Sequence, residues 1–161
     1  MAKAKCTKKK KAPRKSAYLR EVQIRFRKKR IKDGSPVEKP IGDSRQIYEL
    51  FQDLQNETKE KLITISLDIK LKIICFEVVA IGSLTSIYTR PFEAIRAALP
   101  LNPYGIILVH NHPSGDPSPN KVDKNFTKKL MTLTKAGGLY FLDHIIIGDE
   151  DYFSFADKEL I

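Results

Sequence analysis

The stretch from Tyr104 to Asp123 reads YGIILVHNHPSGDPSPNKVD and constrains the fold more than any other part of the chain. Its apolar run, followed by a loop rich in proline, predicts a buried strand, a stiff connection and then a helix. Residues i and i+2 of a strand project from the same face, so His110 and His112 can reach one ion while Asn111 faces the other way. Two imidazoles and the Asp123 carboxylate leave a fourth tetrahedral position open, which is typical of a catalytic zinc site.

Each of these residues also has a simpler interpretation. A bare His-x-His can be a polar pair at a strand end, and Asp123 can serve only the positive end of a helix dipole. The spacing to Asp123 and the rigid loop favour metal binding by His110 and His112. His144 lies in the middle of a later predicted strand, and we expect it to be structural or to support a ligand rather than to bind the metal directly.

The composition limits the alternatives. A chain of 161 residues with 42% hydrophobic residues is long enough for one ordinary domain with an appendage. No apolar run approaches the roughly 20 residues of a membrane span, and no secretory signal follows the basic N-terminus, so we expect a cytoplasmic protein without membrane association. Cys6 and Cys75 are the only cysteines, which leaves histidine and carboxylate as metal ligands.

Positive charge is concentrated at the N-terminus. Residues 1–32 hold 15 of the 29 Lys and Arg residues and one acid, Glu21. Such a segment suits the phosphate backbone of DNA or another nucleic acid, in a salt-dependent and sequence-independent manner. The alternative is a solvated tail without a partner. We expect residues 1–16 to be a disordered basic tail.

Residues 17–42 are predicted to link this tail to the domain, and residues 43–161 to form the domain. Within the linker, Val22, Ile24 and Phe26 alternate with polar residues, which predicts a half-buried strand before a Pro- and Gly-containing loop.

The domain is predicted to intermix helices and strands around one sheet. Strands are expected at residues 62–67, 73–80, 84–88, 106–109 and 139–147, the first two as a hairpin. Helices are expected after a cap at Asp43 or Ser44, after Pro91, and after Ser118 with Pro119 at the first helical position. The buried faces of the first and last helices are predicted to be Ile47, Leu50, Phe51 and Leu54, and Val122, Phe126, Leu130 and Leu133.

A zinc site that activates water also needs a base to move the proton. Glu60 and Glu93 are the candidates. Glu60 begins a strand that alternates so that its side chain can face a cleft, whereas Glu93 falls in the first turn of a helix and can serve only the dipole. Glu60 is the preferred candidate, although spacing alone does not decide between them.

The run HNHPSGDPSP with Asp123, followed by LDHIIIG at residues 142–148, resembles the RadC family of bacterial proteins within the JAMM (MPN+, JAB) metalloprotease superfamily. The resemblance extends from about Val22 to the end of the chain. It implies a zinc ion held by His110, His112 and Asp123, with Glu60 as general acid/base. It also implies a three-layer α/β/α sandwich of the JAB/MPN type, related to the cytidine deaminases.

The sequence departs from the family pattern at two points. Asn120 occupies the position of a serine that is thought to donate a hydrogen bond to the oxyanion. An Asn amide can also donate, but it is longer and placed differently, and the loss of one such donor costs about 10²–10³ in rate. The chain also lacks the helix-hairpin-helix region that precedes this domain in longer family members, so it resembles a short form.

The leading hypothesis is a zinc-dependent hydrolase of peptide or isopeptide bonds that uses a zinc-activated water on a peptide or protein substrate. Asn120 would steady the oxyanion. The alternative is an accessory protein related to DNA repair or mobile elements, which binds DNA through residues 1–32 and keeps a structural or weakly active metal domain. A zinc nucleobase deaminase is a weaker third hypothesis because the P-C-x-x-C half of its signature is missing.

Overall fold

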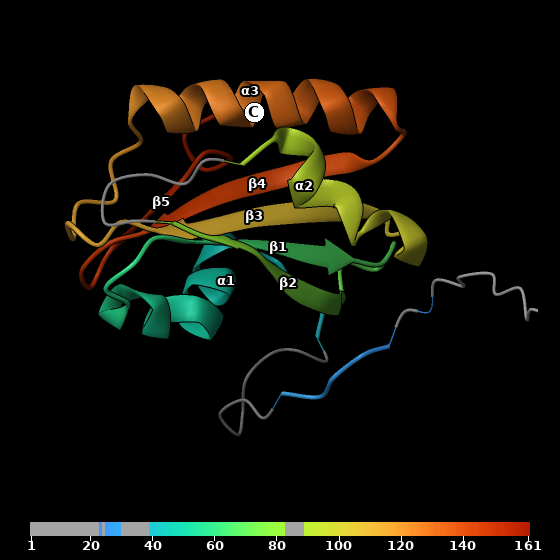
Figure 1. Cartoon of the computed structure of the whole chain (residues 1–161), viewed down its shortest axis with the longest axis horizontal. Coiled ribbons are helices and arrows are strands. Elements are labelled where there is room, and N and C mark those ends of the chain that lie inside the picture. The colour runs from blue at the N-terminus through green and yellow to red at the C-terminus, as the bar shows by residue number, and fades with distance from the viewer. Residues whose placement is uncertain (1–22, 24, 30–38, 83–88) are drawn as a thin grey trace, which may run out of the picture.

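The computed structural model describes residues 23, 25–29, 39–82 and 89–161 (Figure 1). One five-stranded sheet has the order β2-β1-β3-β4-β5. Only β3 and β4 pair in parallel, and the other neighbours are antiparallel. In chain order the elements are α1 (Ser44–Phe51), η2 (Gln52–Asn56), β1 (Lys61–Leu67), β2 (Ile73–Ile81), α2 (Pro91–Arg96), η3 (Leu99–Leu101), β3 (Gly105–Asn111), α3 (Lys121–Ala136), β4 (Tyr140–Ile147) and β5 (Tyr152–Ser154).

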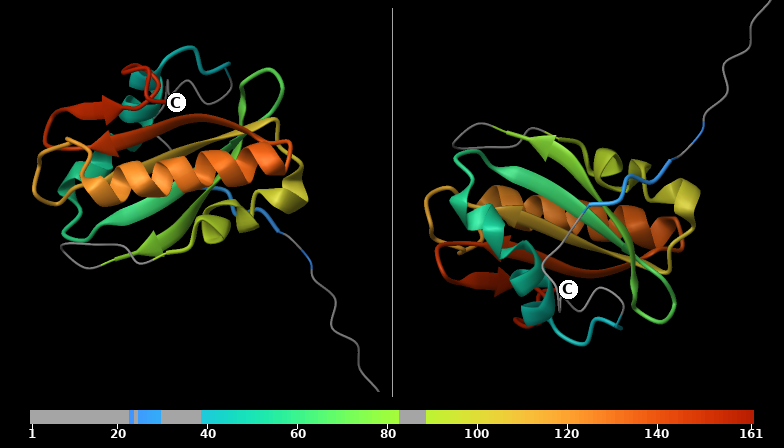
Figure 2. Two further views of the ribbon diagram at one scale, coloured as in Figure 1. Left: turned by 90° about the horizontal axis from the view of Figure 1, so that it is seen from above. Right: turned by 90° about the horizontal axis from the view of Figure 1, so that it is seen from below.

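Helices cover both faces of this sheet. Helices α2 and α3 lie on one face and α1 lies on the other, as the views from above and below show (Figures 1 and 2). Alternate residues of β3 enter two separate cores: Ile107 and Val109 pack with the α1 layer, and Ile106 and Leu108 with the α2 and α3 layer. Strand alternation therefore produces a three-layer α/β/α sandwich, and the predicted fold class is confirmed.

The alternation also decides where polar residues at the strand ends point. Glu60 lies two positions before Leu62, which packs in the α2 and α3 core, and His110 lies two positions after Leu108 in the same core. Both side chains therefore belong to the face covered by α3. Asn111 belongs to the opposite face, where α1 packs.

The predicted first helix and hairpin are present. Asp43, not Ser44, is the N-cap of α1, because its carboxylate accepts the Gln46 N–H. Strands β1 and β2 pair in antiparallel register, and the carboxylate of Asp68 accepts N–H bonds in the turn between them. The chain after α1 tightens into η2, where Leu54 is buried as expected.

The predicted start of the last helix is wrong. Helix α3 begins at Lys121, and its N-cap is Asn120 rather than Ser118. The Asn120 side chain accepts the N–H groups of Val122 and Asp123, and the Asp123 carboxylate accepts the N–H of Asn120, which forms a capping box. Val122, in the first turn of α3, points outward, and 66% of its surface is exposed.

The buried face of α3 is also different from the predicted one. It consists of Asp123, Thr127, Leu130 and Thr134, at helical spacing. Phe126 and Leu133 are partly buried against the same core, so the prediction is wrong mainly at Val122 and at the two threonines. Polar residues on a buried helix face need partners there, and those of Thr127 belong to the candidate site.

Several predictions concern the N-terminal segment and the loop after β2. The described residues of the predicted linker strand, 23 and 25–29, have no regular secondary structure, and Phe26 is 64% exposed, so a half-buried strand is absent there. Phe26 stands among Arg25, Arg27, Lys28 and Lys29, and one apolar side chain offers too little surface to bury there. The tail at 1–16, Val22, Ile24 and the strand expected at 84–88 lie outside the described residues. Of the helices in the described segments, none is long and apolar enough to cross a membrane.

Candidate metal centre

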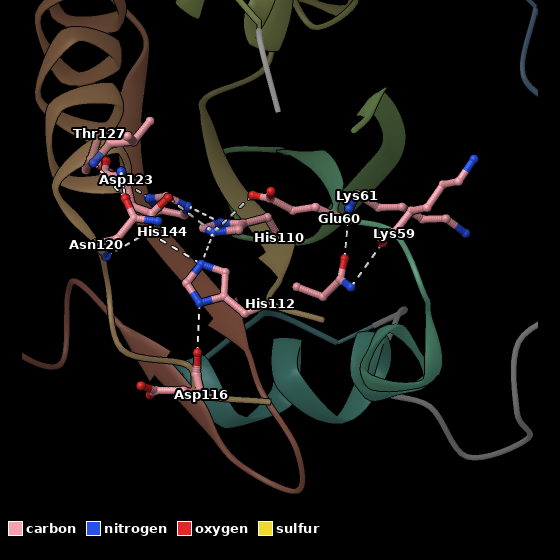
Figure 3. Close-up of polar contacts among 12 residues, drawn as sticks. Lys59, Glu60, Lys61, His110, His112, Asp116, Asn120, Asp123, Thr127 and His144 are labelled. Carbon is pink, nitrogen blue, oxygen red and sulfur yellow. Dashed lines mark hydrogen bonds and ion pairs between the residues drawn. The ribbon is translucent and has the colours of Figure 1, made fainter. Parts of the chain in front are cut away.

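Three elements bring the predicted site residues together at one end of the sheet (Figure 3). Glu60 precedes β1, His110 and His112 lie at the end of β3, and Asp123 lies in the first turn of α3. Strands β1 and β3 pair with Leu62 opposite His110, which sets Glu60 beside the histidines. The 113–120 loop after β3 returns the chain so that α3 starts above the same strand end.

The distances are those of a single compact cluster. His110 Nε2 lies 3.0 Å from His112 Nε2 and 3.5 Å from Asp123 Oδ1. His112 Nε2 lies 3.4 Å from Asp123 Oδ2, and Glu60 Oε1 lies 3.9 Å from His110 Nε2. One ligand atom of each residue falls within 4.8 Å of all the others, and no other group of this kind occurs among the described residues.

A backbone carbonyl fixes the protonation of the His112 ring. Its Nδ1 lies 2.7 Å from the carbonyl oxygen of Asp116. A carbonyl only accepts, so Nδ1 carries a proton and Nε2 is the ring nitrogen that faces the cluster. Burial lowers the pKa of the ring, but its hydrogen bonds to Asp123 and to the Asp116 carbonyl raise it by more. The carboxylate of Asp116 accepts the Ser118 N–H, and Gly115 adopts a φ of 85°, which together hold the loop that delivers this carbonyl.

A chain of three hydrogen bonds fixes His110 in the same way. The Thr127 hydroxyl donates its only proton to the Asp123 carbonyl at 2.8 Å and therefore accepts from His144 Nδ1 at 2.6 Å. His144 Nε2 then has no proton and accepts from His110 Nδ1 at 2.8 Å. His110 Nδ1 is thereby committed to this chain of bonds, and its Nε2 faces His112 and Asp123.

This arrangement shows how His144 takes part. Its Nε2 bonds to the far side of the His110 ring, so it supports that ring and is not one of the clustered groups. His144 is buried. Burial is the main cause that lowers the pKa of its ring well below the usual range, and the nearby His110 is the second, so the ring is neutral. Sequence reasoning had no signal for Thr127 beyond a polar residue four positions after Asp123.

The donor set fits a divalent cation. With both Nδ1 atoms bonded outside the cluster, the two Nε2 atoms and the two carboxylates converge on one another, and a shared proton or a bound cation has to offset the repulsion of their lone pairs. A cation at their centre removes the repulsion, and two His and carboxylate oxygens are ligands that zinc binds. His110 and Asp123 are 2% and 7% exposed, so the surrounding protein is already dry enough to strengthen such bonds.

The two carboxylates of the cluster differ in their electrostatics. Burial would raise the pKa of Asp123, but the His110 and His112 imidazoles and the Asn120 N–H hold it well below its usual range. Burial raises the pKa of Glu60, more than the two histidines lower it. The surroundings of Asp123 therefore favour its ionised form, whereas those of Glu60 bring it closer to the proton affinity that a proton-transfer group needs.

The other two predicted candidates lie differently. The carboxylate of Glu93 pairs with Arg90 and Arg96 in α2 and is not part of the cluster, so Glu60 is the candidate base beside the histidines. Asn120 lies at the edge of the cluster, exposed, with its Oδ1 used by the helix cap. Its backbone N–H donates to Asp123 Oδ2 at 2.8 Å and so orients that carboxylate.

Comparison with known proteins identifies the family of the domain. A family model described as RadC-like JAB domain matches residues 41–160. The chain is 43% identical over 129 residues to a UPF0758 protein of Methanosarcina mazei, which covers 78% of this chain and 56% of the relative. UPF0758 proteins of Aquifex aeolicus and Chlorobaculum parvum are 36% and 38% identical, over 75% and 83% of this chain and 52% and 60% of their own. The chain thus spans just over half the length of these curated relatives.

Proposed function

Because this chain belongs to the RadC-like JAB domain family, we propose that it is a zinc-dependent hydrolase of peptide or isopeptide bonds. The observation that supports this most strongly is the convergence of ligand atoms from Glu60, His110, His112 and Asp123 within 4.8 Å of one another. The metal-binding character of the cluster follows from its donor chemistry. The choice of zinc and of an amide bond as the target are parts of the proposal.

His110, His112 and Asp123 are proposed to hold the ion, each through an atom that the surrounding hydrogen bonds have freed or oriented for it. Asp123 suits a ligand because its carboxylate stays ionised. A bound zinc ion would polarise the scissile carbonyl and lower the pKa of a water molecule to about 7.

Glu60 is proposed to move the proton. Its Oε1 would accept a proton from the attacking water and deliver it to the leaving nitrogen, which converts a poor leaving group into an amine. The raised pKa of Glu60 supports this role, since a carboxylate of ordinary acidity is a weak base near neutral pH. The side chain is 12% exposed, so one edge of the carboxylate remains open to a substrate.

Asn120 is proposed to assist at the oxyanion. Its Oδ1 is committed to the N–H groups of Val122 and Asp123, so Nδ2 is the part of the amide that can donate to a substrate. This commitment also fixes the direction of the amide group. A donor held in place before the reaction stabilises developing charge more effectively than one that must reorient.

The test compares wild type with Glu60→Gln and a control, Glu93→Gln. Zinc content is measured by elemental analysis, and hydrolysis with fluorescently labelled unfolded casein as an amide probe. Glu60→Gln should keep one zinc per chain and lose about 10²–10⁴ in rate, because it removes the proton-transfer group and spares the ligands. Glu93→Gln should keep one zinc per chain and the wild-type rate of hydrolysis. Hydrolysis by Glu60→Gln at the wild-type rate, or zinc lost with Glu60, would contradict the assignment.

A second candidate function is binding of a nucleic acid through the basic N-terminal segment. It is supported by the 15 Lys and Arg residues of positions 1–32 and by the exposure of Arg25, Arg27, Lys28 and Lys29. Affinity for a random-sequence DNA duplex, measured at several salt concentrations, should fall steeply with added salt and on deletion of residues 1–16. Affinity that is unchanged in the truncated protein would exclude this role for the tail.

A further inference from the structure

We propose that Asn111 is the residue that positions Glu60, by holding the backbone on both sides of it. This inference rests on the proposed function of Glu60 in proton transfer. Asn111 lies between His110 and His112 at the end of β3, and strand alternation turns its side chain to the opposite face of the sheet. It is not one of the clustered ligand groups, yet it is 1% exposed.

Both ends of the Asn111 amide are bonded to the chain around Glu60. Asn111 Oδ1 accepts the N–H of Lys61 at 2.8 Å, and Asn111 Nδ2 donates to the carbonyl of Lys59 at 3.2 Å. These two backbone groups belong to the residues immediately before and after Glu60. Figure 3 shows the Glu60 carboxylate directed toward His110 from this segment.

The bonds replace a missing part of the sheet. Strand β1 pairs with β3 from Leu62 opposite His110 to Leu67 opposite Gly105, so the ladder ends before Glu60. The Asn111 side chain offers a carbonyl and an N–H, as a peptide group does, and extends the pairing past Glu60. On the other side of the strand, the N–H of Gly82 donates to the Glu60 carbonyl at 2.8 Å.

The residue type follows from this geometry. Aspartate has the acceptor for Lys61 but lacks a donor for the Lys59 carbonyl, and leucine has a similar size without either group. A buried amide lowers the stability of the fold unless both of its ends are bonded, and here the Lys61 N–H and the Lys59 carbonyl supply the two partners. Asn111 lies between the two histidines in the sequence, so this one side chain sets the distance from Glu60 to both of them.

The simpler alternative is that Asn111 only stabilises the strand end. The two possibilities differ in how Asn111 and Glu60 depend on each other. If Asn111 acts through Glu60, replacing it matters only while the Glu60 carboxylate is present. If it is merely structural, its replacement has the same effect with or without that carboxylate.

The experiment is a double-mutant cycle of Asn111→Leu and Glu60→Gln, read by zinc affinity in competition with a chromophoric chelator. Glu60→Gln should weaken zinc binding about fivefold, because the negative charge of the nearby Glu60 carboxylate attracts the ion even though solvent screens part of that attraction. Asn111→Leu should cause a similar loss in wild type and less than about a twofold loss in the Glu60→Gln protein. Equal losses in both backgrounds, or no loss in wild type, would overturn the proposal.

A second measurement follows the two hydrogen bonds from the Asn111 amide to the backbone of Lys61 and Lys59, here called the clamp, in metal-free protein. Amide hydrogen exchange at Lys61 should become about five- to tenfold faster in Asn111→Leu, as expected for the loss of one hydrogen bond, while exchange at Ile107 stays unchanged. Thr64→Val is the matched control, because it removes a buried hydrogen bond to the Ala94 carbonyl from the same strand. It should leave Lys61 exchange and zinc affinity unchanged. Unchanged Lys61 exchange in Asn111→Leu would mean that the clamp does not exist.

The outcomes separate this inference from the proposed function. Coupled zinc affinities without casein hydrolysis would leave the positioning role standing and remove the hydrolase. If wild type binds no zinc, the proposed function fails, and hydrogen exchange at Lys61 alone decides whether the clamp is present. Should Asn111→Leu not fold, Asn111→Ala removes the same two bonds without filling the space and takes its place in both measurements.

Discussion

Two buried aspartates lie close to the histidines, and their surroundings differ in one respect. Asp143 on β4 is surrounded by donors: the Ser154 hydroxyl bonds to its Oδ2 and the N–H groups of His144 and Ala156 to its Oδ1. Asp123 accepts one backbone N–H, from Asn120, and otherwise faces the Nε2 atoms of His110 and His112, 3.5 and 3.4 Å away.

The difference distinguishes a structural carboxylate from one that needs an external partner. The bonds around Asp143 satisfy it with groups of the protein itself, so its place in the fold is explained without a ligand. Asp123 lies opposite two imidazole nitrogens, and a proton or a metal cation between them makes that arrangement favourable. The local inventory of donors and acceptors therefore predicts which of the two buried acids belongs to a functional site.

The largest expected effect is on metal binding by Asp123→Asn. This variant keeps the size of the side chain and an acceptor for the Asn120 N–H but removes the charged ligand. Zinc affinity should fall by more than the roughly 10–100-fold typical of losing a partner of a ligand. In contrast, Asp143→Asn should retain wild-type zinc affinity in the same chelator competition. Equal losses in both variants would mean that the two aspartates do not differ as described.

The next effect concerns stability, for which we expect the larger loss from replacing Asp143 and the smaller loss from replacing Asp123. Asp143→Ala leaves three buried donors without an acceptor and should lower the free energy of unfolding of the protein by about 2–4 kcal/mol. Chemical denaturation of metal-free protein measures this. Asp123→Ala should cost less in metal-free protein, because only one backbone N–H, that of Asn120, loses its acceptor. A larger loss for Asp123→Ala would contradict the comparison.

A smaller effect tests the support of His110 by Thr127. Thr127→Val and Thr134→Val remove buried hydroxyls two turns apart on α3, each of which donates to the carbonyl four residues earlier. Thr127→Val should weaken zinc binding about tenfold, because the tautomer of His144, and through it that of His110, is no longer fixed. Thr134→Val should leave zinc affinity unchanged. Similar zinc affinities for the two variants would exclude the support of His110 by Thr127 through His144.

The smallest effect concerns the helix cap at the edge of the site. Asn120→Ala should lower the free energy of unfolding by about 1 kcal/mol, since the N–H groups of Val122 and Asp123 lose their acceptor. Asn120→Ser should remain close to wild type, because serine caps a helix equally well. Thermal unfolding of the metal-free variants is the measurement, and equal stability of the alanine and serine variants would argue against the capping box.

The fold and the grouping of the site residues were predictable because both follow from short-range patterns. The alternation of β1 and β3 sets Glu60, His110 and His112 on one face, and the proline-rich loop returns the chain so that Asp123 meets them. The start of α3 was less predictable. Ser118 followed by Pro119 and Asn120 followed by Lys121 are both acceptable helix starts, and only the reciprocal bond with Asp123 decides between them.

The supporting contacts could not be read from the sequence, since they depend on strand register. His144 meets His110 because β3 and β4 pair in parallel with Leu108 opposite His144. Asn111 meets the backbone of Lys59 and Lys61, which lie about 50 positions earlier, because of the register of β1 with β3. Neither register leaves a local pattern that a single sequence reveals.

The most direct test of the account is the zinc content of the purified protein. Wild type and a His110→Ala/His112→Ala variant are stripped with a chelator, exposed to zinc, separated from free metal by gel filtration and analysed for zinc per chain. One zinc per chain in wild type and none in the variant is the predicted result. No zinc in wild type, or the same amount in both proteins, would contradict the claim that these converging acceptors form a metal centre.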